Sequence, residues 1–370
     1  MEEMESGVKE SKQHLYSLDF LRGIAAYIVI FWHWKMLFYV NNNRSQIDSK
    51  DFPFYDLFSI FYNHGLLAVE FFFCLSGFIF FYYFRSKIVR GTLSAKDFAV
   101  DRISRIYPLH IFTFLLVGLL QYTSMESSGY YLAFIYNDSY HALLNVFMLH
   151  AWGVERGFSF NAPSWSISIE SLLYLMFFVS LKIRMPKLVI ALFMILLGAL
   201  LYSCNYNISV GIFSFFIGGA LAMSCEHLSS KMSKIWLLVI SLIILSAGLS
   251  ILIYRSEFNA LWVAALFFAP VIFTFTSISA ISPLFLKRFK FLGDISYSLY
   301  LIHFPLMILA SIFVNKLGID KSIYLQEYFF ISFVVVLTLL GFISHYYFEM
   351  PIMKLIRNSS RKQTSNAEES

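Results

Sequence analysis

The stretch LDFLRGIAAYIVIFWHW at residues 18–34 forms the first apolar helix of this chain and carries its two most informative side chains. Arg22 and His33 are eleven residues apart, and eleven steps of about 100° come within about 20° of three full turns. On a helix the two side chains therefore share one face, about 16 Å apart along the axis. Because a guanidinium and an imidazole are costly in a hydrocarbon environment, the pair predicts a functional site. Asp19 lies three residues before Arg22 and can pair with it on the same face.

Both residues also have a structural interpretation. An arginine at the end of a membrane helix can extend its side chain to the interface. A neutral buried histidine, by contrast, still needs polar partners. The functional interpretation is therefore stronger for His33 than for Arg22.

Composition places the chain in a membrane. Of its 370 residues, 58% are hydrophobic, 19% are aromatic and 14% are charged, whereas a soluble domain is about 25% charged. So much apolar surface cannot be hidden in one soluble core. We expect an all-α polytopic membrane protein, and we expect its three cysteines to be small buried hydrophobes.

We predict about ten transmembrane helices. They are placed near 24–40, 57–84 (with a break near Gly65), 107–122, 164–182, 188–204, 210–225, 235–254, 260–280, 293–313 and 325–347. Most basic residues then fall on one side if both termini are cytoplasmic, which is the positive-inside pattern. The exceptions, outside or in the outer part of a helix, are Lys35, Arg44, Lys50, Arg156, Arg255, Lys316 and Lys321.

This topology divides the chain into three parts. We expect a cytoplasmic segment over 1–17, a transmembrane domain over 18–350 and a disordered cytoplasmic tail over 351–370. Residues 140–152 are apolar but too short to span. We therefore interpret 140–163 as an interfacial or re-entrant element on the outer side, suited to line a substrate entrance.

Two further clusters place charged groups in or beside the membrane. Glu70 precedes three phenylalanines in GLLAVEFFFCLSGFIF, residues 65–80. It needs a partner such as His33 or an arginine, or else it is a protonated structural residue. Arg102 and Arg105, three apart in DRISRIYP, share a helix face at the inner boundary. They are either ordinary positive-inside charge or a clamp for phosphate.

Two more clusters supply candidates for a substrate pocket. The segment NAPSWSISIES, residues 161–171, contains Ser164, Trp165, Ser166 and Glu170. Capping of a helix start explains the serines but not Glu170. The segment GDISYSLYLIHFPL, residues 293–306, contains Tyr297, Tyr300 and His303, the last two on one helix face. Nowhere does the spacing of a metal-binding, Walker A or GxSxG motif occur, so no metal is expected.

Taken together, these clusters resemble the membrane-bound acyltransferase-3 family, whose members O-acylate extracytoplasmic glycans and related molecules. The matching pieces are the R-x10-H spacing of Arg22 and His33, then FFFCLSGF, RISRIYP, PSWSISIE and GDISYSLYLIHFP, in the family's order over 18 to about 350. The resemblance implies a ten-helix core, a cytoplasmic acyl-CoA donor, an acceptor on the outer side, and essential roles for Arg22 and His33. It also places Arg102 and Arg105 near the CoA. The SGNH-type esterase domain that many members carry at the C-terminus does not fit within this chain.

The resulting hypothesis is an O-acetyltransferase of the bacterial plasma membrane. Arginines at the cytoplasmic side would bind the phosphates of acetyl-CoA, the donor, with no cofactor needed. His33 would act as a general base, with Glu70 orienting its ring, or would carry the acyl group itself. The expected partners are acyl-CoA, a carbohydrate acceptor and membrane lipids, with no nucleic acid. The rival classes are a multi-pass transporter and an accessory subunit of polysaccharide export, while the acceptor, the acyl group and the oligomeric state stay open.

Overall fold

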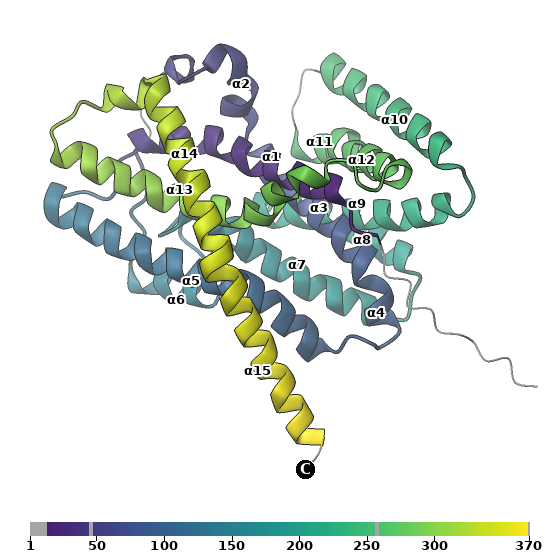
Figure 1. Cartoon of the computed structure of the whole chain (residues 1–370). Coiled ribbons are helices and arrows are strands. Elements are labelled where there is room, and N and C mark those ends of the chain that lie inside the picture. Colours follow the sequence, from purple (N-terminus) through teal and green to yellow (C-terminus); the bar gives the residue numbers. More distant parts are fainter. Residues whose placement is uncertain (1–12, 44–46, 256–258, 369–370) are drawn as a thin grey trace, which may run out of the picture.

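Residues 13–43, 47–255 and 259–368 are described by the computed structural model, and helices make up most of their path (Figure 1). Within these ranges the only β-type pairings are isolated bridges at Val40. The predicted all-α class is therefore confirmed. Residues 1–12 of the predicted N-terminal segment lie outside the described part.

The α-helices follow in chain order. They are α1 (Tyr16–His33), α2 (Tyr55–His64), α3 (Leu67–Tyr83), α4 (Arg85–Val89), α5 (Ala95–Ser128), α6 (Ser139–Val146), α7 (Trp165–Lys182), α8 (Lys187–Leu200), α9 (Tyr206–Ser229), α10 (Lys234–Arg255), α11 (Ala260–Val263), α12 (Ala269–Ile281), α13 (Lys290–Lys316), α14 (Glu327–Ser344) and α15 (Met350–Glu368). Short 3₁₀ and π turns join several of them.

Helices able to cross a membrane dominate the described residues. Seven helical stretches are long and apolar enough, and the pair α2–α3 would make an eighth. The pair is bent by 65°, at the position where a break near Gly65 is predicted. Of the remaining predicted spans, 24–40 corresponds to α1 and 188–204 to the short helix α8. A multi-pass protein is therefore confirmed, and the number ten stays a prediction.

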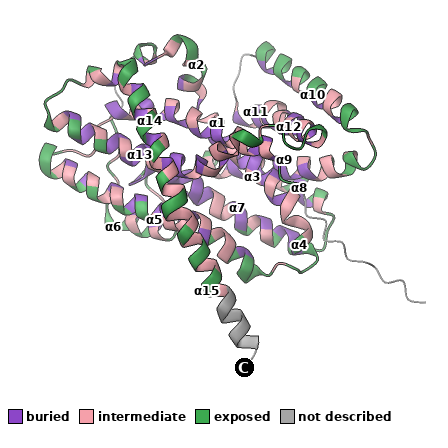
Figure 2. Cartoon of the chain, viewed as in Figure 1, coloured by how far each residue is buried: buried purple, intermediate pink, exposed green. Residues whose placement is uncertain are grey.

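Burial separates central from peripheral helices. In the apolar window of α13, 67% of the residues are buried, whereas the figure is 22% for α10. Figure 2 shows buried residues concentrated in the middle of the molecule, around α1, α3 and α9, and exposed ones along α10 and α14. Since the exposed residues of α10 and α14 are largely apolar, such as Ile243 and Leu339, these faces suit contact with lipid.

Glycines let the central helices approach closely. A Cβ on Gly77 of α3 would lie 1.8 Å from the carbonyl oxygen of Phe215 in α9, so no side chain fits there. The helices α1 and α13 approach in the same way, since a Cβ on Gly293 would lie 2.5 Å from the Cβ of Asp19. Small residues of this kind are what close packing in membranes requires.

The first helix begins earlier than predicted, at Tyr16 rather than near residue 24, and ends at His33. A 3₁₀ turn, Trp34–Phe38, follows it. The indole N–H of the buried Trp34 donates to the carbonyl of Tyr324 at 2.9 Å. This bond fixes the end of α1 and with it the position of His33.

The segment 140–163 contains α6, which at 8 residues is too short to span. Beyond α6 the backbone is irregular and bonded to α7: the indole N–H of Trp152 donates to Ser168 O at 2.9 Å, and Ser168 Oγ donates to Met148 O at 2.7 Å. Such backbone is tolerated inside a membrane protein when its polar groups are satisfied in this way. Its place on the outer side remains a prediction.

The start of the tail, for which disorder over 351–370 is predicted, is helical. After a π turn at His345–Glu349, the chain continues as α15 (Figure 1). Pro351 stands in the first turn of α15, where proline is tolerated. The helix is held to α5, because Arg357 Nε lies 2.9 Å from Asp101 Oδ1. The first turns of this segment are therefore helical and held to α5, and disorder of the tail beyond Arg357 stays a prediction.

Candidate functional site

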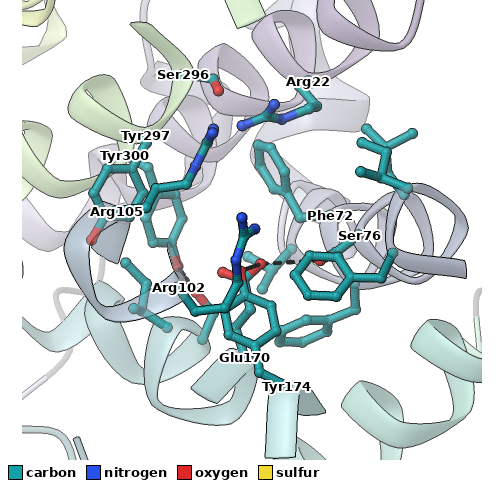
Figure 3. Close-up of a pocket in the computed structure, with 17 residues that line it drawn as sticks. Arg22, Phe72, Ser76, Arg102, Arg105, Glu170, Tyr174, Ser296, Tyr297 and Tyr300 are labelled. Atoms are coloured by element: carbon teal, nitrogen blue, oxygen red, sulfur yellow. Dashed lines mark hydrogen bonds between the residues drawn. The ribbon is translucent and has the colours of Figure 1, made fainter. Parts of the chain in front are cut away.

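Three arginines converge on one cavity of about 140 Å³, which we call the arginine cavity (Figure 3). Arg22 comes from α1, and Arg102 and Arg105 come from α5. Arg22 is flanked by Asp19, whose Oδ1 lies 3.9 Å from Nη1. The guanidinium of Arg102 lies over the rings of Phe80 and Phe84. The structure thus brings together the three residues predicted to bind the donor.

One carboxylate lines this cavity. Glu170 of α7 accepts hydrogen bonds from Tyr174 Oη at 2.6 Å and from Ser76 Oγ at 3.1 Å (Figure 3). Three cations against one carboxylate leave an excess of positive charge among the lining residues. In a partly dehydrated site, such an excess favours an anion with several oxygens.

The histidine of the R-x10-H motif has a partner on another helix. Nδ1 of His33 lies 2.9 Å from Nε2 of His303 in α13, and the two rings stack at 4.9 Å. His33 is 3% exposed and His303 is fully buried. Because α1 and α13 run side by side from Asp19 and Gly293 onward, the same packing aligns the two histidines.

Either ring can donate the proton of the 2.9 Å contact between the two histidines. The other nitrogen of His303, Nδ1, is buried and has no hydrogen-bond partner among the described residues. When His33 donates through its Nδ1–H, its lone pair lies on Nε2, where a base is useful.

A second hollow, which we call the histidine cavity, has a volume of about 580 Å³ and includes His33 in its wall. The turn after α1 supplies one side. The irregular segment before α7 supplies another, through Arg156, Gly157 and Phe158. The predicted element at 140–163 therefore lines a cavity beside His33, and its role as a substrate entrance stays a prediction.

Tyr300 and Ser166 lie between the two cavities. Ser166 Oγ donates to Tyr300 Oη at 2.7 Å, and Tyr300 Oη donates to the carbonyl of Pro163 at 2.6 Å. Ser166 and Tyr300 line the arginine cavity, whereas Pro163 and Trp165 line the histidine cavity. This hydrogen-bonded wall therefore joins residues that line one cavity to residues that line the other.

The remaining predicted residues are placed as follows. Tyr297 lines the arginine cavity and donates to the carbonyl of Ile106. Ser164 is fully buried, with its Oγ 3.0 Å from Nε2 of His150. Burial lowers the pKa of His150 to about 3, so this histidine is neutral and fits a structural role. Asp19 lies beside Arg22 rather than in the lining of the cavity.

The expected orientation of His33 by Glu70 is wrong. Glu70 Oε1 accepts from Tyr206 Oη at 2.6 Å, and its Oε2, which is buried, has no partner among the described residues. The ring of His33 is held by His303 instead. Glu70 lies on the face of α3 that packs toward α9, and side-chain direction across helices cannot be read from spacing within one helix.

Several lining residues were not predicted. Ser76, Tyr174 and Ser296 join the arginine cavity, and Lys35 and Arg156 join the histidine cavity. Lys35 and Arg156 had one signal in the sequence, since they are basic residues on the side where such residues are scarce.

Most of the chain matches one known protein family. Residues 15–347 match the family described as "Acyltransferase domain", which covers most of the chain. The chain is also 33% identical over 118 residues to "Acyltransferase MdmB" of Streptomyces mycarofaciens. That stretch is 30% of this chain and 27% of the relative, so less than two thirds of the relative is covered. No solved structure matches.

Proposed function

The chain belongs to the acyltransferase-3 family, and we propose that it moves an acyl group, acetyl in the simplest case, from cytoplasmic acyl-CoA to a hydroxyl of a glycan across a bacterial plasma membrane. The observation that carries the proposal is the arrangement of two cavities on either side of one wall. One is lined by Arg22, Arg102 and Arg105 and the other by His33.

The arginine cavity suits the donor. CoA carries several phosphates, and guanidinium groups bind phosphate oxygens through paired, charge-assisted hydrogen bonds. The excess positive charge of the lining residues supports this role. The pantetheine arm is neutral and narrow, so it would enter past the arginines and bring the thioester toward Tyr300.

The histidine pair suits the chemistry at the acceptor. Nε2 of His33 would take the proton of the acceptor hydroxyl as the oxygen attacks the thioester carbon. The C–S bond then breaks, and the proton passes to the CoA thiolate, so that an ester and free CoA result. In the alternative route Nε2 attacks the thioester carbon and the C–S bond breaks, which releases CoA thiolate. The hydroxyl then attacks the acyl carbon on His33, its proton passes to the thiolate, and the ester and neutral His33 result. Both routes require a lone pair on Nε2 of His33, and it is left there when the Nδ1–H of His33 donates to Nε2 of His303.

We expect His303 to position the catalytic histidine. Replacing His303 by alanine removes the acceptor for the Nδ1–H of His33 and should lower kcat by about tenfold to a hundredfold, a range taken from outer-shell partners of histidine ligands. His303→Gln keeps an acceptor and should restore part of the activity. The pH profile of kcat should shift in His303→Ala, because the tautomer and proton affinity of His33 change. An unchanged profile with equal losses in both variants would leave His303 with a packing role only.

Consumption of the thioester separates this function from its rivals. The purified protein, reconstituted in vesicles, should release free CoA from acetyl-CoA in the presence of a glycan extract of the expressing cell, with one ester formed per CoA. A transporter, or an accessory subunit of polysaccharide export, would leave the thioester intact. Release of CoA at the rate seen with empty vesicles would overturn the proposal.

A further inference from the structure

The side chains that line the histidine cavity indicate what kind of acceptor it binds. Its wall combines aromatic rings with cations, and no described residue that lines it is acidic. The aromatic residues are Trp32, Tyr39, Phe134, Tyr136, Phe158 and Trp165. Flat apolar surfaces of this kind suit the CH faces of sugar rings, and a volume of about 580 Å³ lies within the range of small-molecule sites.

Two cations line the same cavity as His33. Lys35 follows His33 by two residues, and its ammonium lies 3.0 Å from the centroid of the Trp32 ring. Arg156 enters from the irregular segment before α7, with its guanidinium 5.2 Å from the centroid of Tyr140. Two segments far apart in sequence thus supply positive charge to one hollow.

Neither cation is explained by topology. By the predicted orientation both lie on the outer side, where short loops are poor in lysine and arginine. Orientation in the membrane therefore does not explain why both cations lie beside the proposed base. Binding of an anion in the cavity would explain it.

The acidic groups near Arg156 are engaged outside the lining. Asp138 binds the backbone N–H and the ring of His141, each at 2.9 Å. The hydrogen bond from that backbone N–H is the main cause that lowers the pKa of Asp138, so the carboxylate is ionised. Glu155 accepts from the backbone N–H of Gly153 at 2.8 Å. The carboxylate of Asp138 attracts Arg156 electrostatically, but neither acid lines the cavity, so the lining residues themselves carry a net positive charge.

We infer that the acceptor is an anionic glycan, with a carboxylate or phosphate group bound by Lys35 and Arg156. This inference rests on the proposed function and narrows its substrate class. A guanidinium and an ammonium bind carboxylate and phosphate oxygens more strongly than neutral hydroxyls. Anchoring the anion on these groups would hold the sugar against the aromatic wall and present one of its hydroxyls to Nε2 of His33.

Binding of three matched glycosides tests the inference without requiring turnover. The probes are methyl β-D-glucuronoside, methyl β-D-glucoside 6-phosphate and the neutral methyl β-D-glucoside. Their binding to the full-length protein in detergent can be followed through tryptophan fluorescence, because Trp32 and Trp165 line the cavity. We expect at least one anionic probe to bind about tenfold more tightly than the neutral one, the factor that one net charged contact supplies. Which anionic probe binds more tightly tells a sugar acid from a sugar phosphate.

Charge-removing variants locate the effect. Lys35→Gln and Arg156→Gln should each weaken binding of the anionic probe about tenfold and leave the neutral probe unaffected, whereas Arg156→Lys should retain part of the preference. The matched control is Arg255→Gln, which removes a cation stacked on Trp262, outside the cavity. It should change nothing.

Two results would overturn the inference. One is equal affinity of the wild-type protein for all three probes, or no measurable binding of the anionic ones. The other is an anion preference that survives in the double variant. Either can occur while acetyl-CoA is still consumed, so failure here is distinguishable from failure of the proposed acyltransferase activity.

Discussion

Replacing His33 by alanine should abolish acyl transfer while the protein remains folded and inserted in the membrane. The substitution removes the only ring nitrogen that faces the acceptor in the proposed reaction. Positioned acid–base catalysis contributes about 10²–10⁴-fold to rate, so the remaining activity should fall by at least that factor. The measurement is release of CoA and formation of ester with purified, reconstituted protein.

The control for His33 is His227→Ala. His227 is an exposed histidine near the end of α9, outside both cavities, and its loss should leave the rate unchanged. Substantial activity in His33→Ala with normal membrane insertion would contradict the assignment of His33 as the catalytic residue. Trapping of an acyl group on His33 would choose the relay route over general base catalysis.

The second large effect is expected at the arginine cavity. Each charge-assisted hydrogen bond to a phosphate is worth about 1.5–3 kcal/mol, so Arg105→Gln should raise KM for acetyl-CoA by about tenfold to a hundredfold. Arg22→Lys should also be damaging, because an ammonium cannot reproduce the paired donors of a guanidinium. The measurement is steady-state kinetics with acetyl-CoA varied at a saturating acceptor concentration.

A matched control is Arg288→Gln, which removes an exposed cation that lies against Phe289 and not in the cavity. It should leave KM unchanged. A silent Arg22→Lys would mean that Arg22 only extends to the membrane interface, and a silent Arg105→Gln would place the donor elsewhere.

Periodicity within a helix was a sound guide to part of this site. The eleven-residue spacing of Arg22 and His33 puts both on the side of α1 that faces α13, and the spacing of Arg102 and Arg105 puts both in one cavity. Such inferences need only the geometry of a single helix. The break in the helix near Gly65 was equally local, since a side chain there would clash with Phe61 O.

Partners between helices were beyond the same reasoning. His33 lies close to His303, which is 270 positions away in the sequence. Glu70 lies on a face of α3 where it binds Tyr206 of α9 rather than His33. What decides this is the close approach of α1 and α13 at Gly23 and Gly293. No periodicity within one segment encodes which glycine faces which helix. The contact of α15 with α5 is of the same kind, because the ion pair between Arg357 and Asp101 joins residues far apart in the sequence.

If the two cavities are the donor and acceptor ends of one path, the acyl group must cross the membrane, and this transfer can be measured. Inverted membrane vesicles from cells producing the protein can be loaded with the three methyl glycosides and supplied with labelled acetyl-CoA outside. We expect labelled O-acetyl glycoside in the lumen, free CoA outside in equal amount, and neither with His33→Ala. Label found only on glycoside added outside, or equal labelling in wild type and His33→Ala, would contradict it.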